Sequence, residues 1–372
     1  LAFTNTLSST YYYRGALCHL SAGSAHFHIA NCSFTNCGDS GAYIGGPYCV
    51  ATNNTATNCA AYGVRLMGLS SLYEDNTTTG GCRGGAQGGR FSVTRYSKIY
   101  NAVTSYNGMH SDSIGFMDGG ADSLNHYGHI YGCWIDNFVE GFALYGTGGG
   151  MTNWLIHSNV VVSRRSETGY GDGSIMLQGC HHMYFFNNTF VGFNAGVLGA
   201  TGSAVLYIED HSSGPDATDN TYIVFKNNLI AGESGSGIRV DANQLTGFES
   251  ANNHFYYTNN TTPFMYAGPY QNLSQWLALG YESGFHSTHG LTTDPAFKDF
   301  ANQDFTLASS SPDIGAGEDL SAYFTLDHAG NTRTAWDLGA YRYASGAEVE
   351  ETGGGYLAFA VGSNHLVLAV SA

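Results

Sequence analysis

The sequence predicts an all-β protein, a right-handed parallel β-helix solenoid in which short strands stack coil upon coil. Three observations lead to this prediction: a composition rich in Gly and aromatic residues, a short apolar strand unit that recurs along the chain, and an asparagine-rich turn between its copies. Because a solenoid grows by adding coils, a chain of 372 residues does not have to be divided into several globular domains.

The composition favours strands and polar turns over amphipathic helices. The chain has 51 Gly, 26 Tyr and 21 Phe but only 6 Pro, and charged residues make up 11% of it. That charged fraction is well below the roughly 25% of an average soluble domain. A β-sandwich or propeller would also need many short strands, but hairpin signals are scarce before residue 350, so we favour the solenoid.

The strand unit is a small residue followed by two apolar residues spaced by one. Each copy is a short strand with one face directed inward, because alternate side chains of a strand point to opposite sides. The first copies are 26 and 22 residues apart, and the last two are 33 apart, so the later coils carry longer loops. The copies lie at residues 15–18, 41–44, 63–66, 113–116, 141–144, 174–177, 204–208 and 237–240.

The second repeated unit is a polar turn between two strands. Asn tolerates the left-handed backbone conformation that a tight turn needs, and stacked Asn side chains can satisfy buried polar groups. The pattern therefore predicts an asparagine ladder inside the solenoid. Alignment on the following apolar residue assigns to this ladder Cys32, Asn54, Ala102, Cys133, Ser158, Asn188, Asn228 and Asn253.

The eight cysteines follow the coil spacing. Cys37, Cys59 and Cys82 are 22 and 23 residues apart, one coil each, so we expect them to stack. Most cysteines are interpreted as small buried side chains, while oxidation of a stacked pair stays open. The chain contains no Cys-x-x-Cys motif, which argues against a zinc site.

The charge balance excludes two classes of partner. The net charge is −16, and Lys98, Lys226 and Lys298 are the only lysines. Nucleic acids and anionic membrane surfaces both require clustered cations, so we expect no binding to either. The longest apolar stretch, 356–372, is short and interrupted, so no membrane insertion is expected. The chain begins at Leu1 without an initiating Met, and we expect that a segment precedes it.

The chain divides into four predicted parts. Residues 1–275 form the β-helix coils, and 276–345 form a segment that closes the solenoid at its C-terminal end. Residues 346–355 are an acidic, Gly-rich linker, and 356–372 form an apolar β-hairpin. Because an isolated hairpin is marginally stable in water, we expect it to dock either on its own solenoid or on another copy, giving a homo-oligomer or a larger assembly.

The segment from Trp276 to Tyr343 resembles one that is common in bacterial and phage parallel β-helix proteins of the pectate-lyase-like superfamily. The matching stretches are, in order, QW at 275–276, TDPAF at 293–297, DFTL at 304–307, SPDIGAG at 311–317, DHAGNTR at 327–333 and WDLGAY at 336–341. They cover roughly a fifth of the chain. The resemblance implies the fold and an extracellular or virion location. Members of this superfamily include polysaccharide lyases, glycosidases, epimerases, phage tailspikes and adhesins, so the resemblance does not imply one reaction.

The outward positions of the repeated strands are the candidate binding surface. Aromatic rings beside amide, carboxylate and guanidinium groups are suited to a polysaccharide or cell-surface glycan. A plain solvated surface, with Glu209 paired to Arg239 across coils, is the competing interpretation. The candidate substrate-binding residues are Tyr145, Gln178, Tyr207, Glu209, Arg239 and Asp241.

Candidate catalytic residues are carboxylates, because glycoside hydrolysis uses a pair of them. The candidates are Asp112, Asp172, Glu209 and Asp241. Asp112 and Asp172 are also good turn residues. No cofactor is expected, although a carboxylate cluster can hold Ca²⁺. The polygalacturonase motifs are absent, and two classes stay open: a phage tail or fibre-like receptor-binding protein, and a secreted polysaccharide lyase or glycoside hydrolase.

Overall fold

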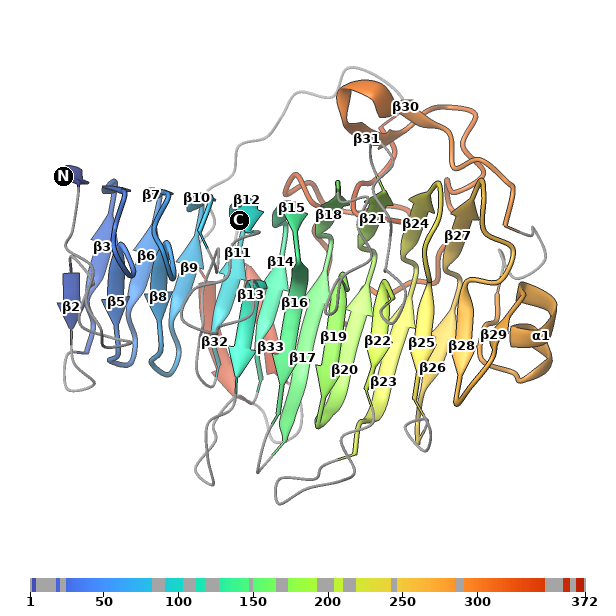
Figure 1. The fold of residues 1–372 in the computed structure, drawn as a ribbon, viewed down its shortest axis with the longest axis horizontal. Coiled ribbons are helices and arrows are strands. Elements are labelled where there is room, and N and C mark those ends of the chain that lie inside the picture. Colours follow the sequence, from blue (N-terminus) through green and yellow to red (C-terminus); the bar gives the residue numbers. More distant parts are fainter. Residues whose placement is uncertain are drawn as a thin grey trace.

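The computed structural model is a parallel β-helix whose coils stack along one axis (Figure 1). It describes residues 2–4, 18–20, 25–81, 91–102, 112–117, 127–146, 150–164, 173–192, 204–209, 219–241, 246–284, 291–344, 357–361 and 366–370, with the backbone alone for 2–4, 18–20, 117, 357–361 and 366–370. The described strands of the coils fall into three stacks of parallel strands, as the fold class predicted from the sequence requires. The prediction of a parallel β-helix is confirmed.

The three sheets are named here in the order in which a coil passes through them. The first sheet is described in two parts. Its three-stranded part comprises β2 (Cys18–Leu20), β5 (Ala42–Ile44) and β8 (Val64–Leu66). Its seven-stranded part comprises β13 (Asp112–Met117), β16 (Glu140–Tyr145), β19 (Ile175–Gln178), β22 (Leu206–Ile208), β25 (Ile238–Val240), β28 (Phe264–Tyr266) and the antiparallel β29 (Tyr270–Gln271). Every predicted strand unit from 41–44 onward lies in this sheet.

The other two sheets follow in each coil. The second comprises β3 (His28–Ala30), β6 (Val50–Thr52), β9 (Leu72–Glu74), β11 (Val93–Arg95), β14 (His129–Tyr131), β17 (Met151–His157), β20 (Cys180–Phe186), β23 (Thr221–Lys226) and β26 (Glu249–Ala251). The third comprises β1 (Ala2–Thr4), β4 (Ser33–Thr35), β7 (Thr55–Thr57), β10 (Thr77–Thr79), β12 (Lys98–Ala102), β15 (Trp134–Phe138), β18 (Val160–Ser163), β21 (Thr189–Gly192), β24 (Leu229–Gly232) and β27 (His254–Tyr257).

The core is a column of apolar side chains inside the coils. In β19, Ile175 and Leu177 are buried while Met176 and Gln178 are partly exposed, which is the alternation expected of a strand with one face inward. Because every strand is short, each coil supplies only a few core residues and depends on its neighbours to cover them. The first sheet therefore presents a continuous row of outward side chains that spans several coils.

The asparagine ladder exists, and the structure corrects its membership. Within it, Asn188 donates from its backbone N–H and its amide to Asn228 Oδ1 at 2.9 and 3.0 Å, and Asn228 does the same to Asn253. Leaving one such amide unpaired would cost about 1–3 kcal/mol per buried group. Ala102 and Ser158 do not belong to the ladder. Its members are Cys32, Asn54, Asn76, Ser97, Cys133, Asn159, Asn188, Asn228 and Asn253.

The cysteines of the described ranges are buried free thiols. Six are described with side chains, and Cys37 and Cys59 interact on adjacent coils as their spacing predicts. Cys82 lies outside the described residues. Burial raises the pKa of the Cys180 thiol to about 12, which keeps it protonated and unreactive at neutral pH.

The C-terminal end of the solenoid is covered by α1 (Leu273–Ala278). Asn272 and Gln275 form a capping box at its start. Trp276 is fully buried and stacks on Phe264 of the last coil, with ring centroids 5.1 Å apart. Trp276 is therefore the side chain that covers the core at this end of the solenoid.

The rest of the C-terminal segment lies elsewhere than the sequence suggested. The segment 276–345 was predicted to close the C-terminal end of the solenoid, but its residues Phe297, Phe305, Leu307 and Ile314 pack on the outside of the third sheet. Here β30 (Phe297–Asp299), a 3₁₀ turn η2 (Phe300–Asn302) and β31 (Asp304–Leu307) run back along the solenoid beside β18 and β21 (Figure 1). The outward valines of β18 supply the apolar surface that receives them.

The tail residues form the predicted hairpin. β32 (Leu357–Val361) and β33 (Leu366–Val370) pair antiparallel, from Leu357 with Val370 to Val361 with Leu366. The linker 346–355 lies outside the described residues. Among the described residues, no helix is long and apolar enough to cross a membrane.

Candidate functional site

The strand register brings the predicted substrate-binding residues together on four successive coils of the first sheet. Tyr145 pairs with Gln178, and Tyr207 pairs with Arg239. Glu209 and Asp241 come one residue after β22 and β25, and their backbone N–H groups still donate to the previous coil at 3.0 and 3.1 Å. All six side chains therefore belong to two outward rows. We call these rows, with Asp112 and Glu140 described below, the polar face.

Asp241 is the centre of one half of the polar face. The Tyr207 hydroxyl donates to Asp241 Oδ2 at 2.9 Å, and Arg239 Nε donates to Asp241 Oδ1 at 3.2 Å. The Arg239 guanidinium also lies over the Tyr207 ring, 4.3 Å from its centroid. Burial, followed by the hydrogen bond to Asp241, raises the pKa of Tyr207. Its phenol therefore stays protonated and holds its orientation.

Glu209 is the centre of the second half. Gln178 Nε2 donates to Glu209 Oε2, and the Asn220 amide donates to the Glu209 backbone carbonyl at 2.7 Å. Because Glu209 and Asp241 follow neighbouring strands, their backbones are about 4.8 Å apart. Both carboxylates are only partly buried, so a ligand can reach them. The suggested pairing of Glu209 with Arg239 is wrong, since Arg239 pairs with Asp241.

A buried acidic pair lies at the other end of the same strands. Asp112 of β13 and Glu140 of β16 are direct neighbours in the register and are 0% and 1% exposed. The Tyr145 hydroxyl donates to Glu140 Oε2 at 2.7 Å. Burial raises the pKa of Tyr145, and the charges of Glu140, Asp112 and Glu209 raise it further. The Tyr145 hydroxyl therefore stays protonated and donates to Glu140, with the carboxyl groups of Asp112 and Glu209 also close enough to act on it.

Sequence analysis missed Glu140, although a signal for it was present. Glu140 comes directly before the strand unit 141–144, as Asp112 comes directly before the unit 113–116. Comparing the residue before each unit would have paired the two carboxyls. Asp172 lies outside the described residues, so its relation to the polar face is not described.

The described residues offer no set of ligands for a metal ion. Within the described ranges, no group of three or more His, Cys, Asp or Glu side chains is placed to hold a metal ion. The Ca²⁺ option from the sequence therefore has no residues assigned to it.

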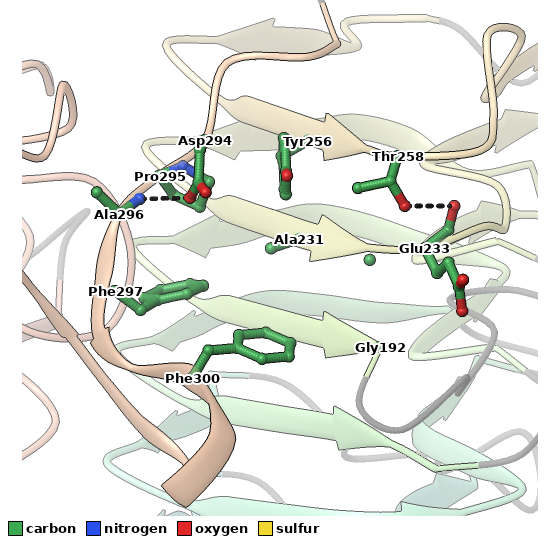
Figure 2. A pocket seen from close by; sticks show the side chains of 11 residues that line it. Gly192, Ala231, Glu233, Tyr256, Thr258, Asp294, Pro295, Ala296, Phe297 and Phe300 are labelled. Carbon is green, nitrogen blue, oxygen red and sulfur yellow. Dashed lines mark hydrogen bonds between the residues drawn. The ribbon is translucent and has the colours of Figure 1, made fainter.

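A pocket lies outside the third sheet, apart from the polar face, where the C-terminal segment passes β21, β24 and β27 (Figure 2). Its volume is about 480 Å³, within the roughly 300–1,000 Å³ of ligand pockets. The small residues Gly192, Ala231 and Gly232 make it possible, because larger side chains on the sheet would fill the space. The other lining residues are Glu233, Tyr256, Thr258, Asp294, Pro295, Ala296, Phe297 and Phe300.

The walls of this pocket combine aromatic rings with carboxylates. Phe297 and Phe300 come from the C-terminal segment, and Tyr256 from β27 (Figure 2). Asp294 Oδ1 accepts the Ala296 N–H at 2.8 Å, and burial followed by the Asp294 charge raises the pKa of Tyr256. No Lys or Arg is among its described lining residues. The pocket therefore suits an uncharged ligand with an apolar face and hydroxyl groups.

Nothing in the strand pattern predicted this pocket. Its floor belongs to the solenoid, but two of its aromatic walls come from a segment more than 60 residues further along the chain. Only the observed path of the C-terminal segment brings them together.

Comparison with known proteins agrees with this geometry at the level of the fold. A solved structure, the crystal structure of pectate lyase Pel9A, superposes with a TM-score of 0.51 at 16% sequence identity, covering 92% of this chain and 86% of that one. The chain has the parallel β-helix fold of that lyase. At this identity the similarity of this β-helix to Pel9A shows the fold alone. No protein-family model matches the chain, and no curated protein matches it by sequence.

Proposed function

We propose that this β-helix binds a polysaccharide along the polar face and acts as a glycan-recognition protein outside the cell or on a virus particle. The observation that carries the proposal is the joint placement of Tyr207, Arg239 and Asp241 beside Gln178 and Glu209. Sugar recognition needs such fixed donors and acceptors, and the Tyr207 ring, 6% exposed beneath the Arg239 guanidinium, supports them from below. The row crosses several coils, which gives it the length to follow a chain of sugars.

The charges of the polar face favour a neutral polysaccharide. Asp112, Glu140, Glu209 and Asp241 are four carboxyl groups, and Arg239 is the one cation placed among them by the described residues. A polyuronate would bring further negative charge to a protein whose net charge is already −16. A neutral glycan instead donates its hydroxyls to these acceptors.

A structural or receptor-binding role on a phage tail or fibre is the finer form of the proposal. The apolar hairpin of β32 and β33 supports it, because two isolated strands are marginally stable in water and gain from docking on a partner. The acidic, Gly-rich sequence 346–355 would tether the hairpin to the solenoid.

Glycoside hydrolysis is a second candidate, favoured by Glu209 and Asp241. Retaining glycosidases use two carboxyl groups about 5–5.5 Å apart, close to the spacing of adjacent coils. Lyase chemistry is less suited to the described residues, because it needs a base. The pKa values of Tyr145 and Tyr207 are raised, so both phenols stay protonated and neither is available to accept a proton. Arg239 is paired with Asp241.

The test is a panel of neutral and acidic polysaccharides, followed by retention in affinity gels, new reducing ends and unsaturated-uronate absorbance. We expect retention by a neutral polysaccharide, weakened about tenfold or more by Arg239→Ala, since lost hydrogen bonds to charged groups cost about 1.5–3 kcal/mol. Glu318→Gln, an exposed site elsewhere, is the control.

The outcomes separate the alternatives. New reducing ends that disappear in both Glu209→Gln and Asp241→Asn would establish the hydrolase. Retention without cleavage supports the binding protein. If no polysaccharide is retained or cleaved, or if Arg239→Ala binds as well as the unaltered protein, the polar face is not the binding surface.

A further inference from the structure

One corner of the solenoid carries aromatic residues where the other corners carry asparagine. The corner lies where each coil enters the second sheet, and nine of its residues stack in one column. Tyr48 N–H, for example, donates to the carbonyl of Leu69, the residue before Ser70, at 2.7 Å. We call this column the aromatic corner; it comprises His26, Tyr48, Ser70, Phe91, Tyr127, Asn153, His182, Tyr222 and Gly247.

The backbone of this corner is unfavourable for aromatic side chains. All nine residues have positive φ, with 56° at Tyr48, 59° at Phe91 and 56° at Tyr222. Asn, Asp and Gly adopt this conformation most readily, and bulky residues rarely do. The corner before the third sheet has the same backbone, and Tyr96 is the one aromatic residue among its described members. Those members are Asn31, Asn53, Asp75, Tyr96, Gly132, Ser158, Asn187, Asn227, Asn252 and Gly284.

The rings form three parallel stacked pairs. The centroid distances are 5.0 Å for His26 and Tyr48, 5.3 Å for Phe91 and Tyr127, and 4.6 Å for His182 and Tyr222, with planes within 10° of parallel. The pairs remain open to solvent: Tyr48 is 52% and Tyr222 is 49% exposed. Stacking within a pair contributes to stability, but exposed rings on a backbone that Asn would strain less also offer a surface to a ligand.

The gaps between the pairs have the thickness of one sugar ring. Ser70 and Asn153 interrupt the column, so the rings of Tyr48 and Phe91 are two coils, about 9.6 Å, apart. Apolar atoms make contact at about 3.5–4.0 Å, so a gap of this width is wide enough for one puckered ring to enter between the two faces. The negative ring faces attract the C–H groups of a pyranose.

We propose that the aromatic corner is a second glycan-binding surface, which takes uncharged pyranose units of a polysaccharide between its ring pairs. The inference rests on the proposed glycan recognition and deepens it. Only three residues separate Gln178 of the polar face from His182 of the corner, so one polymer can contact both. Three ring pairs along the column suit a long chain and give little to a short oligosaccharide.

The test replaces one ring of each pair by the residue that the backbone prefers. In the triple variant Tyr48→Asn, Tyr127→Asn, Tyr222→Asn we expect an unchanged or higher melting temperature, because Asn tolerates positive φ. Retention in gels containing each of a panel of neutral polysaccharides should fall about tenfold or more. The matched control is Tyr270→Asn, at a tyrosine that is 42% exposed and lies outside the column.

Comparison with Arg239→Ala separates the two surfaces. If the triple variant is retained within about twofold of the unaltered protein, the aromatic corner is not a binding surface, whatever Arg239→Ala does. If the triple variant loses retention while Arg239→Ala keeps it, the corner binds glycan and the polar face does not. A triple variant that melts well below the unaltered protein would show that the rings serve stability, which also overturns the inference.

Discussion

At the residue scale, Glu282 ends the asparagine ladder where the next coil would have supplied an amide. Its carboxyl oxygens accept the Ser250 hydroxyl, and they accept the Asn253 backbone N–H at 3.1 Å and its amide at 3.2 Å. Burial raises the pKa of this carboxyl to about 7, although the same hydrogen bonds oppose the shift. The last rung of the ladder therefore titrates near neutral pH.

This shift makes stability depend on pH in a defined direction. The folded protein holds the Glu282 proton up to about pH 7, whereas the unfolded chain releases it near its ordinary pKa of 4.5. The contribution to stability is therefore complete below about pH 4.5 and is lost as the pH rises toward 7, by up to about 3 kcal/mol. In Glu282→Gln we expect this loss to be absent, so melting curves of the two proteins should diverge as the pH rises from 4.5 to 8.

The control for this titration is Glu318→Gln, at an exposed carboxyl on another part of the surface. A constant difference in melting temperature between Glu282→Gln and the unaltered protein over this pH range would contradict the assignment of the titration to Glu282.

At the element scale, regular spacing made the first-sheet strands predictable, and irregular spacing limited the ladder. The strand units from 41–44 to 237–240 could be found because a small residue opens each of them. The ladder alignment failed at Ala102, which is the last residue of β12, whereas the ladder residue Ser97 comes directly before that strand. It failed at Ser158 by one position, since the ladder residue is Asn159. The C-terminal strands were misplaced because strand periodicity does not say which outer surface a segment will cover.

The hairpin of β32 and β33 carries a prediction of its own. Removing residues 347–372 should leave the solenoid folded, because the core clusters of the described side chains are formed by residues before 347. If the hairpin docks on another copy, light scattering should show a smaller oligomer after truncation, with unchanged circular dichroism of the solenoid strands. An unchanged mass would rule out docking between copies, and a lower melting temperature at unchanged mass would show docking on the chain's own solenoid.

At the scale of the whole molecule, the stack of coils converts residues that are distant in sequence into one surface. The six candidate substrate-binding residues span 145 to 241, yet strand register alone aligns them in two outward rows. This could be predicted because parallel pairing in a solenoid is fixed by the repeat. The pocket beside the third sheet could not be predicted in the same way, because it depends on the path of the C-terminal segment. Glu140 was missed because it lies outside the apolar pattern, although its place directly before a strand unit was a usable signal.

The most direct test of the central proposal is a crystal structure of the protein with an oligosaccharide derived from the polysaccharide that it retains. We predict sugar density over the polar face, with hydroxyls within about 3.2 Å of Glu209, Arg239 and Asp241. Density confined to the pocket beside the third sheet, or to the aromatic corner, with the polar face empty, would contradict the proposal that the polar face is the glycan-binding site.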